Sequence, residues 1–386
     1  MSVITKERPI IVTGSERSGT TLIMTILGCH PEIAVPEVTW YYPRFRPYIH
    51  TYGDLSVAEN FRTLVNEMAY GTRKPFFGLD VNPVIFANEI HDLAMGKEQS
   101  FAGVFTAALE RYAQAQGKPR WGEKTPYNLF YIGEIVEDLP DAQIVFITRD
   151  GRDVCAEFLD ASFGPTNIYA ASELWDMGQK AVMPWRDSLK SDQWYDVNYE
   201  TLVRDPVGEL KKLCAFLGVD YTDELLAFHS TPIAQRRGQT KDNAALADPI
   251  SDKYVGRYKY ELSVRDQQIF SSIADDTMRA LGYEELAEPL ALSDEQIALY
   301  EEMDGRYRAA TLDAPAGWIV FESYNDWLVD QREARRRAGV WSSVPDPAPF
   351  PIGHKHEEYF SGMRAKRQWK DHYSVKREYS QTRSVL

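Results

Sequence analysis

The chain has 386 residues, of which 44% are hydrophobic and 26% are charged, with a net charge of −14. This is the composition of a globular protein, and the negative charge argues against general nucleic-acid binding, which needs a basic face. No apolar run approaches the roughly 20 residues of a membrane helix, so we expect a cytoplasmic protein without a transmembrane segment. The three cysteines are widely spaced, which predicts reduced thiols and no metal site.

The first predicted elements enclose a short loop that contains glycine. Ile10 to Val12 is an apolar, β-branched run that indicates a buried strand. Leu22 to Cys29 has the character of a helix that ends before Pro31. Between them lies Gly14 to Thr21, with the sequence GSERSGTT. A loop that leads from a strand into a helix N-terminus presents backbone N–H groups to a ligand and therefore favours anions.

The spacing of Gly14 and Gly19 fits a phosphate-binding loop, but a nucleotide kinase places lysine directly after the second glycine. Thr20 stands at that position, and the cation lies earlier, at Arg17. A guanidinium there can bind two oxygens of a tetrahedral anion. We therefore expect an anion site that differs from that of the nucleotide kinases.

Strands and helices alternate along most of the chain that follows. Apolar runs predict further strands at Ile33–Val35, Ile144–Ile147 and Tyr195–Tyr199. Helices are predicted between and after these strands, at Leu55–Tyr70, Phe101–Gln114, a segment that ends near Pro140, a stretch through Phe158, the second part of Glu200–Leu217, and Ser263–Leu281. This alternation predicts an α/β fold, in which helices flank both faces of a mostly parallel sheet.

The segment Trp40–Tyr52 is rich in aromatic and basic residues. We interpret it as a segment that faces the substrate or forms a lid, rather than as a regular element. Packing in the core would explain its aromatic residues equally well.

The character of the chain changes near residue 287, so we predict a domain over residues 1–286 and an extension over residues 287–386. Ser293 and Gln296 form a capping-box pattern that opens a helix. Trp318–Ala338 is a second helical candidate, and the prolines between 345 and 351 predict an extended linker before a basic and aromatic tail. This helical arm is a candidate surface for homo-oligomer formation.

The run Arg17-Ser18-Gly19-Thr20-Thr21 resembles the 5′-phosphosulfate loop of sulfotransferases that use 3′-phosphoadenosine 5′-phosphosulfate (PAPS). The arginine form of the loop is similar to that of the membrane-bound Golgi and bacterial branch. The resemblance implies that all five residues bind PAPS and its product, 3′-phosphoadenosine 5′-phosphate (PAP).

Two later segments resemble the parts of that family that hold the 3′-phosphate. ITRDGRDV at residues 147–154 is similar to the second family signature, which implies that Arg149 contacts the 3′-phosphate. The family places a serine eight residues later, where this chain has Glu157. A carboxylate repels a phosphate unless a cation intervenes. YVGRYK at residues 254–259 is similar to the loop that closes on the nucleotide, so the resemblance makes Arg257 a second phosphate contact that could partly offset Glu157.

A further family motif is similar to WGEKTP at residues 121–126. The resemblance implies that Lys124 neutralises charge on the bridging oxygen as the phosphate leaves. Cytosolic relatives have a catalytic histidine soon after this motif, and this chain does not. Golgi-type relatives use a glutamate soon after the His-Pro pair, so Glu37 is our candidate general base. Asp80 is the reserve candidate, and we interpret His30 as a helix-end residue.

The resemblance covers about residues 8 to 285 and implies in-line transfer of a sulfuryl group from PAPS, without a metal. The acceptor would be a hydroxyl or amine of a small molecule, glycan or lipid. Glu37 would take the acceptor proton, and Arg17 and Lys124 would stabilise negative charge. Two alternatives stay open. Glu157 favours a non-catalytic nucleotide-binding or scaffold protein on the same fold, and a P-loop kinase is opposed by Thr20.

Overall fold

The computed structural model describes residues 8–70, 75–161, 164–284, 286–310, 328 and 330–340. The chain divides into two compact units. The first unit comprises residues 1–149 and 178–255, and the second comprises residues 150–177 and 256–386. The boundary that the sequence predicts after residue 286 stays a prediction.

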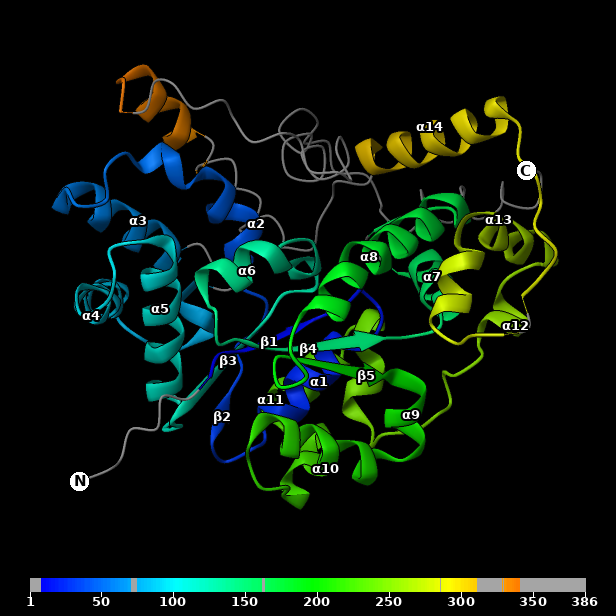
Figure 1. Cartoon of the computed structure of the whole chain (residues 1–386), viewed down its shortest axis with the longest axis horizontal. Helices are drawn as coiled ribbons and strands as arrows, with labels where there is room; N and C mark the ends of the chain where they lie inside the picture. Colours follow the sequence, from blue (N-terminus) through cyan, green and yellow to red (C-terminus); the bar gives the residue numbers. More distant parts are fainter. Residues whose placement is uncertain are drawn as a thin grey trace. The chain divides into compact units, whose positions relative to one another are not determined.

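A five-stranded parallel sheet forms the centre of the first unit (Figure 1). Its strands are β1 (Ile10–Thr13), β2 (Ile33–Ala34), β3 (Arg120–Lys124), β4 (Gln143–Thr148) and β5 (Trp194–Asn198). They lie in the order β2-β3-β1-β4-β5, so β1 pairs with β3 on one side and with β4 on the other. The predicted α/β fold with a parallel sheet is confirmed.

Helices flank this sheet, with α1 and α10 on one face and α6 on the other in Figure 1. The α-helices that lie wholly in the first unit are α1 (Thr20–Leu27), α2 (Tyr41–Phe45), α3 (Ala58–Tyr70), α4 (Pro83–Met95), α5 (Phe101–Ala115), α6 (Ile132–Asp138), α9 (Tyr199–Arg204), α10 (Pro206–Leu217) and α11 (Pro232–Gly238). Its 3-10 helices are η1 (Arg46–Tyr52), η2 (Pro75–Gly78), η3 (Pro126–Phe130), η4 (Asp223–Ser230) and η5 (Lys241–Ala247).

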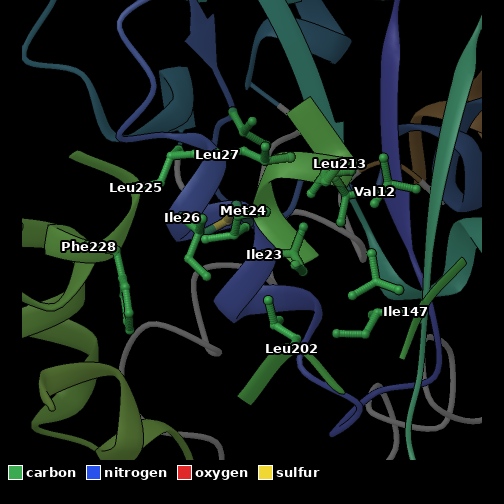
Figure 2. Packing of buried hydrophobic residues seen from close by; sticks show 14 of the residues in the cluster. Val12, Ile23, Met24, Ile26, Leu27, Ile147, Leu202, Leu213, Leu225 and Phe228 are labelled. Carbon is green, nitrogen blue, oxygen red and sulfur yellow. The ribbon is translucent and has the colours of Figure 1, made fainter. Parts of the chain in front are cut away.

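The core beneath the sheet anchors α1 (Figure 2). Ile23, Ile26 and Leu27 of α1 are fully buried against Val12 of β1 and Ile147 of β4. Leu202 of α9, Leu213 of α10, and Leu225 and Phe228 of η4 belong to the same core. Burial of an aliphatic side chain stabilises the fold by about 1.5–3 kcal/mol. The N-terminus of α1, and the loop before it, are therefore held against the sheet.

The prediction of an irregular segment at Trp40–Tyr52 was wrong, because α2 and η1 occupy it. Its aromatic residues are core residues: Tyr41, Tyr42 and Phe45 are fully buried. The ring of Tyr42 packs edge-on against Phe105 of α5, with a centroid distance of 5.2 Å. A charged and aromatic sequence does not distinguish a lid from a helix whose aromatic side chains pack against another helix.

The second unit is helical within its described residues. It contains α7 (Gly151–Asp160), α12 (Tyr258–Glu261), α13 (Val264–Ala280), α14 (Asp294–Ala310) and residues 168–177 of α8 (Ile168–Ser188). Trp175 of α8 is fully buried and packs against Phe270 of α13, at a centroid distance of 5.8 Å. The predicted helix from Ser263 is confirmed, with Ser263 as its N-cap.

The predicted capping box at the start of α14 is also confirmed. The backbone N–H of Ser293 donates to Gln296 Oε1 at 3.0 Å, and that of Gln296 donates to Ser293 Oγ at 3.3 Å. Of the predicted helix Trp318–Ala338, residues 330–337 are helical and Gly339 follows with φ of 73°. Most of the remainder of that helix, and all of the proline-containing linker, lie outside the described residues.

We expect Asp304→Ala to lower the free energy of unfolding by about 1–3 kcal/mol, because it removes a charged acceptor from a buried site. Asp304 is 1% exposed, and its Oδ1 accepts the backbone N–H and the hydroxyl of Thr166 at 2.8 and 2.9 Å. Urea denaturation followed by circular dichroism measures the change. Glu301→Ala on the exposed face of α14 is the control, and an equal effect of both variants would contradict the prediction.

Two smaller expectations concern the cysteines and the membrane. Cys29, Cys155 and Cys214 are all free thiols, as predicted. Among the helices that the structure describes, none has the length and apolar character needed to cross a bilayer.

Candidate functional site

The predicted site residues of the first unit converge on one edge of the sheet. In a parallel sheet every strand ends at the same edge, and ligands of α/β proteins bind there. The loop Gly14–Thr21, here called the glycine loop, follows β1, and Glu37 follows β2. Lys124 is the last residue of β3, and Arg149 follows β4.

Two glycines of the glycine loop are required by its geometry. Gly14 has φ of 152°, and a Cβ there would lie 2.5 Å from the carbonyl oxygen of Ile147. Gly19, the N-cap of α1, has φ of 101°, and a Cβ there would lie 3.0 Å from both Ile147 and Tyr199. The loop therefore packs its backbone directly on the end of β4, where other residues do not fit.

The N-terminus of α1 has the features of an anion site. No side chain caps it, and its first turn contains no acidic residue. Ser18 is fully buried, and its Oγ has no hydrogen-bond partner among the described residues. Backbone N–H groups at a helix N-terminus attract negative charge, and a buried hydroxyl needs a partner. The residues of the loop thus fit an anionic group.

Lys124 lies at this N-terminus. Its side chain is 1% exposed, and its Nζ donates to Thr21 Oγ1, at 3.4 Å, in the first turn of α1. The structure therefore brings Lys124 to the glycine loop, although 103 residues separate it from Thr21. A buried ammonium beside a helix N-terminus reinforces the positive potential of the site.

Arg17 and Arg149 also meet in this part of the first unit. Arg17 Nη2 donates to the carbonyl oxygen of Asp242 at 2.7 Å, and Arg149 Nη1 donates to the carbonyl oxygen of Arg17 at 2.9 Å. The guanidinium of Arg149 lies over the ring of Tyr199, 4.5 Å from its centroid. Three cations, those of Arg17, Lys124 and Arg149, are thus associated with one short loop.

Glu37, the predicted base, is held by two arginines that sequence reasoning missed. Its Oε1 pairs with Arg236 Nη2 at 2.5 Å, and its Oε2 pairs with Arg237 Nη2. Both arginines belong to α11, 199 and 200 residues away in sequence. Burial, followed by the charge of Glu37, raises the pKa of nearby Tyr112 to about 12. The two guanidiniums favour the ionised form of Glu37.

Glu123 is a further residue that the sequence did not single out. It is fully buried and accepts hydrogen bonds from the hydroxyls of Thr39 at 2.7 Å and Thr125 at 2.6 Å, and from the Asn128 amide at 2.5 Å. Burial raises the pKa of the Glu123 carboxyl, while these donors and Lys124 oppose the rise. Through these hydrogen bonds, Glu123 links the segment that follows β2 to the segment that follows β3. Adjacent residues of a strand point to opposite faces of the sheet, so the side chains of Glu123 and Lys124 lie on different faces.

Asp80, the reserve candidate, and His30, the predicted helix-end residue, lie in different surroundings. Asp80 is exposed between η2 and α4. His30 is 2% exposed, with Nε2 at 2.9 Å from the carbonyl oxygen of Asp220 and Nδ1 accepting the backbone N–H of Glu32 at 3.1 Å. Both ring nitrogens of His30 bond to the backbone, which agrees with its interpretation as a helix-end residue.

In the second unit, Arg257 pairs with Glu157. Arg257 Nη1 lies 3.0 Å from Glu157 Oε1, and its Nε donates to Glu261 Oε2 at 2.8 Å. The sequence offered Arg257 as a phosphate contact that could partly offset the charge of Glu157, and the structure places the two side chains in a direct ion pair. Two carboxylates already share the charge of Arg257, so its role toward a phosphate stays a prediction.

The model of the Sulfotransferase family matches residues 9–223, which is more than half of the chain. The chain belongs to the sulfotransferase family. The matched residues include the glycine loop, Glu37, Lys124 and Arg149, and they end before the arginine pair of α11.

Individual relatives of this chain are distant. An uncharacterized protein of Aquifex aeolicus (strain VF5) is 25% identical over 234 residues, which are 58% of this chain and 27% of that protein. The protein-tyrosine sulfotransferase of Drosophila melanogaster is 23% identical over 300 residues, which are 74% of this chain and 53% of that protein. The chain thus spans 27% and 53% of the lengths of these two relatives.

A solved structure shows a weak likeness. The sulfotransferase domain from the curacin biosynthetic pathway is 20% identical, with a TM-score of 0.49 over 72% of this chain and 98% of that domain.

Proposed function

We propose that this sulfotransferase transfers a sulfuryl group from PAPS to a hydroxyl or amine of a small-molecule, glycan or lipid acceptor. One observation carries the proposal: the buried Lys124 ammonium lies 3.4 Å from Thr21 Oγ1 at an uncapped helix N-terminus, behind a loop framed by Gly14 and Gly19. This arrangement presents backbone N–H groups and a fixed cation to one anion.

The residues of the chain have separate tasks in this proposal. When bound, PAPS supplies the sulfuryl group and the PAP leaving group. The backbone N–H groups of Gly19, Thr20 and Thr21, with the Ser18 hydroxyl and Arg17, would bind the 5′ phosphosulfate. Lys124 holds positive charge where negative charge develops during transfer, in a site with little water to screen it. Arg149 and Arg257 stay predicted contacts of the 3′-phosphate.

Glu37 is the proposed general base. A carboxylate between two guanidiniums is ionised and can accept a proton, but only from a donor that reaches one of its oxygens. The side chain of Arg236 is 55% exposed, whereas that of Arg237 is 12% exposed. The acceptor hydroxyl would therefore replace Arg236 at Glu37 Oε1, while Arg237 keeps the carboxylate in place.

Titration calorimetry with PAP tests cofactor binding. We expect micromolar binding by the wild type, a loss of at least about tenfold in Arg17→Ala, and no loss in Arg62→Ala, whose guanidinium contacts the exposed Asn88 side chain. No binding of PAP by folded, nucleotide-free wild type would contradict the proposal.

Transfer of labelled sulfate from PAPS to a panel of acceptors tests the reaction. The panel holds phenols, sugars, amines, lipids and a tyrosine peptide, the last because a relative is named protein-tyrosine sulfotransferase. PAP binding without transfer to any acceptor would favour the non-catalytic alternative. Turnover of ATP with Mg²⁺ would favour the kinase. Cytoplasmic location, self-association and the absence of nucleic-acid binding stay predictions.

A further inference from the structure

Arg149 is a buried arginine whose guanidinium is fixed by its neighbours. It is 2% exposed and is among the largest fully buried side chains of the chain. Its guanidinium stacks over Tyr199, and its Nη1 and Nη2 donate to the carbonyl oxygens of Arg17 at 2.9 Å and Tyr254 at 3.1 Å. A planar group held on one face and at two nitrogens has a fixed orientation.

The carbonyl that Arg149 holds belongs to a strained residue. Arg17 has φ of 67°, in the left-handed region that residues other than glycine rarely adopt. Such a conformation persists only where surrounding contacts maintain it. Arg149 supplies one such contact at the backbone, and the carbonyl of Asp242 supplies another at the Arg17 side chain, at 2.7 Å.

The peptide unit between Arg17 and Ser18 is consequently fixed at both ends. In a trans peptide the C=O and N–H groups point in opposite directions. The Arg17 C=O is directed to Arg149, and the Ser18 N–H donates to the carbonyl oxygen of Ser15 at 3.1 Å. This orientation closes the turn from Ser15 to Ser18 and leads directly into Gly19, the N-cap of α1.

We propose that Arg149 is a positioning residue for the glycine loop: through the Arg17 carbonyl it holds the loop in the conformation that presents the α1 N-terminus to an anion. This role is additional to any contact with the 3′-phosphate. Its effect on nucleotide binding rests on the proposed function, whereas the hydrogen bond from Arg149 to the Arg17 carbonyl is present in the ligand-free chain.

Hydrogen exchange of the ligand-free protein tests the hold directly. In Arg149→Gln, we expect peptides that cover residues 14–22 to exchange faster by about tenfold or more, because a charge-assisted hydrogen bond to the loop is lost. Peptides from α10 report on global unfolding and should be unchanged. Arg152→Gln is the matched control, since Arg152 is a 4% exposed arginine that pairs with Asp150 in the second unit.

Nucleotide titrations supply the second arm, with PAP and with adenosine 5′-monophosphate (AMP), which lacks the 3′-phosphate. A positioning role predicts that Arg149→Gln lowers the affinity for AMP by about tenfold or more. Arg149→Lys keeps a positive charge for a 3′-phosphate but cannot form the two hydrogen bonds of the guanidinium fork. We therefore expect its affinity for AMP to be lower than that of the wild type, as in Arg149→Gln.

The outcomes separate this inference from the proposed function. Faster exchange of the loop with weaker AMP binding supports the inference. Unchanged exchange, with weaker PAP but unchanged AMP binding, overturns it, because Arg149 would then act on the 3′-phosphate alone. Faster exchange in a chain whose wild type binds neither nucleotide would refute the proposed function and leave the positioning role standing.

Discussion

Replacing Lys124 by methionine lowers kcat for sulfuryl transfer by about two to three orders of magnitude, the effect of removing one fixed charge from a site where negative charge develops. The Lys124 side chain is 1% exposed and its Nζ lies at the N-terminus of α1, so little water screens its charge. Methionine has a similar length and no charge to bury, so we expect the free energy of unfolding to stay equal or to rise.

Initial rates with labelled PAPS, together with PAP titrations, separate the two effects of this change. We expect the loss to appear mainly in kcat, because the contribution of Lys124 is largest when the leaving phosphate gains charge. Lys118→Met is the matched control, since Lys118 donates to the carbonyl oxygens of Gly28 and Ile33, at 2.6 and 3.0 Å, before β3 begins. A Lys124→Met variant within about threefold of wild-type kcat would exclude the catalytic role of this lysine.

Glu37→Gln is expected to lower kcat by about 10²–10⁴-fold and to leave PAP affinity unchanged, because the amide cannot take the acceptor proton. We expect protonation of Glu37 to lower wild-type activity toward acid, and this loss should be absent in the variant. Rates across a range of pH, measured with the acceptor found in the transfer panel, check both statements.

Arg236→Gln provides the control for the charge pair. This variant removes the charge of Arg236, whose side chain is 55% exposed, and leaves the carboxylate of Glu37 in place. We expect kcat to change by less than about tenfold, because Arg237 still pairs with the Glu37 carboxylate. If Glu37→Gln and Arg236→Gln reduced kcat equally, the pair would be structural, and Asp80 would become the candidate base.

Much of the sheet could be predicted from the sequence, because a buried parallel strand is an uninterrupted apolar run. This holds for β1, for β2 and for β4, whose Ile144–Ile147 run is fully buried. β3 was missed, since three of its five residues are Arg120, Glu123 and Lys124. Each is buried with partners from distant segments, such as the Leu217 carbonyl that accepts from Arg120 at 2.6 Å. A strand of this kind cannot be read from hydrophobicity.

The candidate site also has one part that could be predicted from the local sequence and another that could not. The glycine loop could be predicted because its strand, its two glycines and its helix are neighbours in sequence, and their geometry depends on local backbone preferences. The sequence also assigned Lys124, Arg149 and Glu37 to the site, but by resemblance. What each of them contacts could not be predicted in that way.

By itself, then, the sequence determined a parallel α/β sheet with a glycine-containing loop between its first strand and first helix, because apolar runs and glycine spacing act over a few residues. Only the tertiary structure decided the partners of the charged groups: Glu37 with Arg236 and Arg237, Arg149 with the Arg17 carbonyl, and Arg257 with Glu157. Such pairs join segments 100 to 200 residues apart in sequence. They form only once strand order and helix packing have brought those segments together, since charged side chains carry no sequence signal of which partner they will meet.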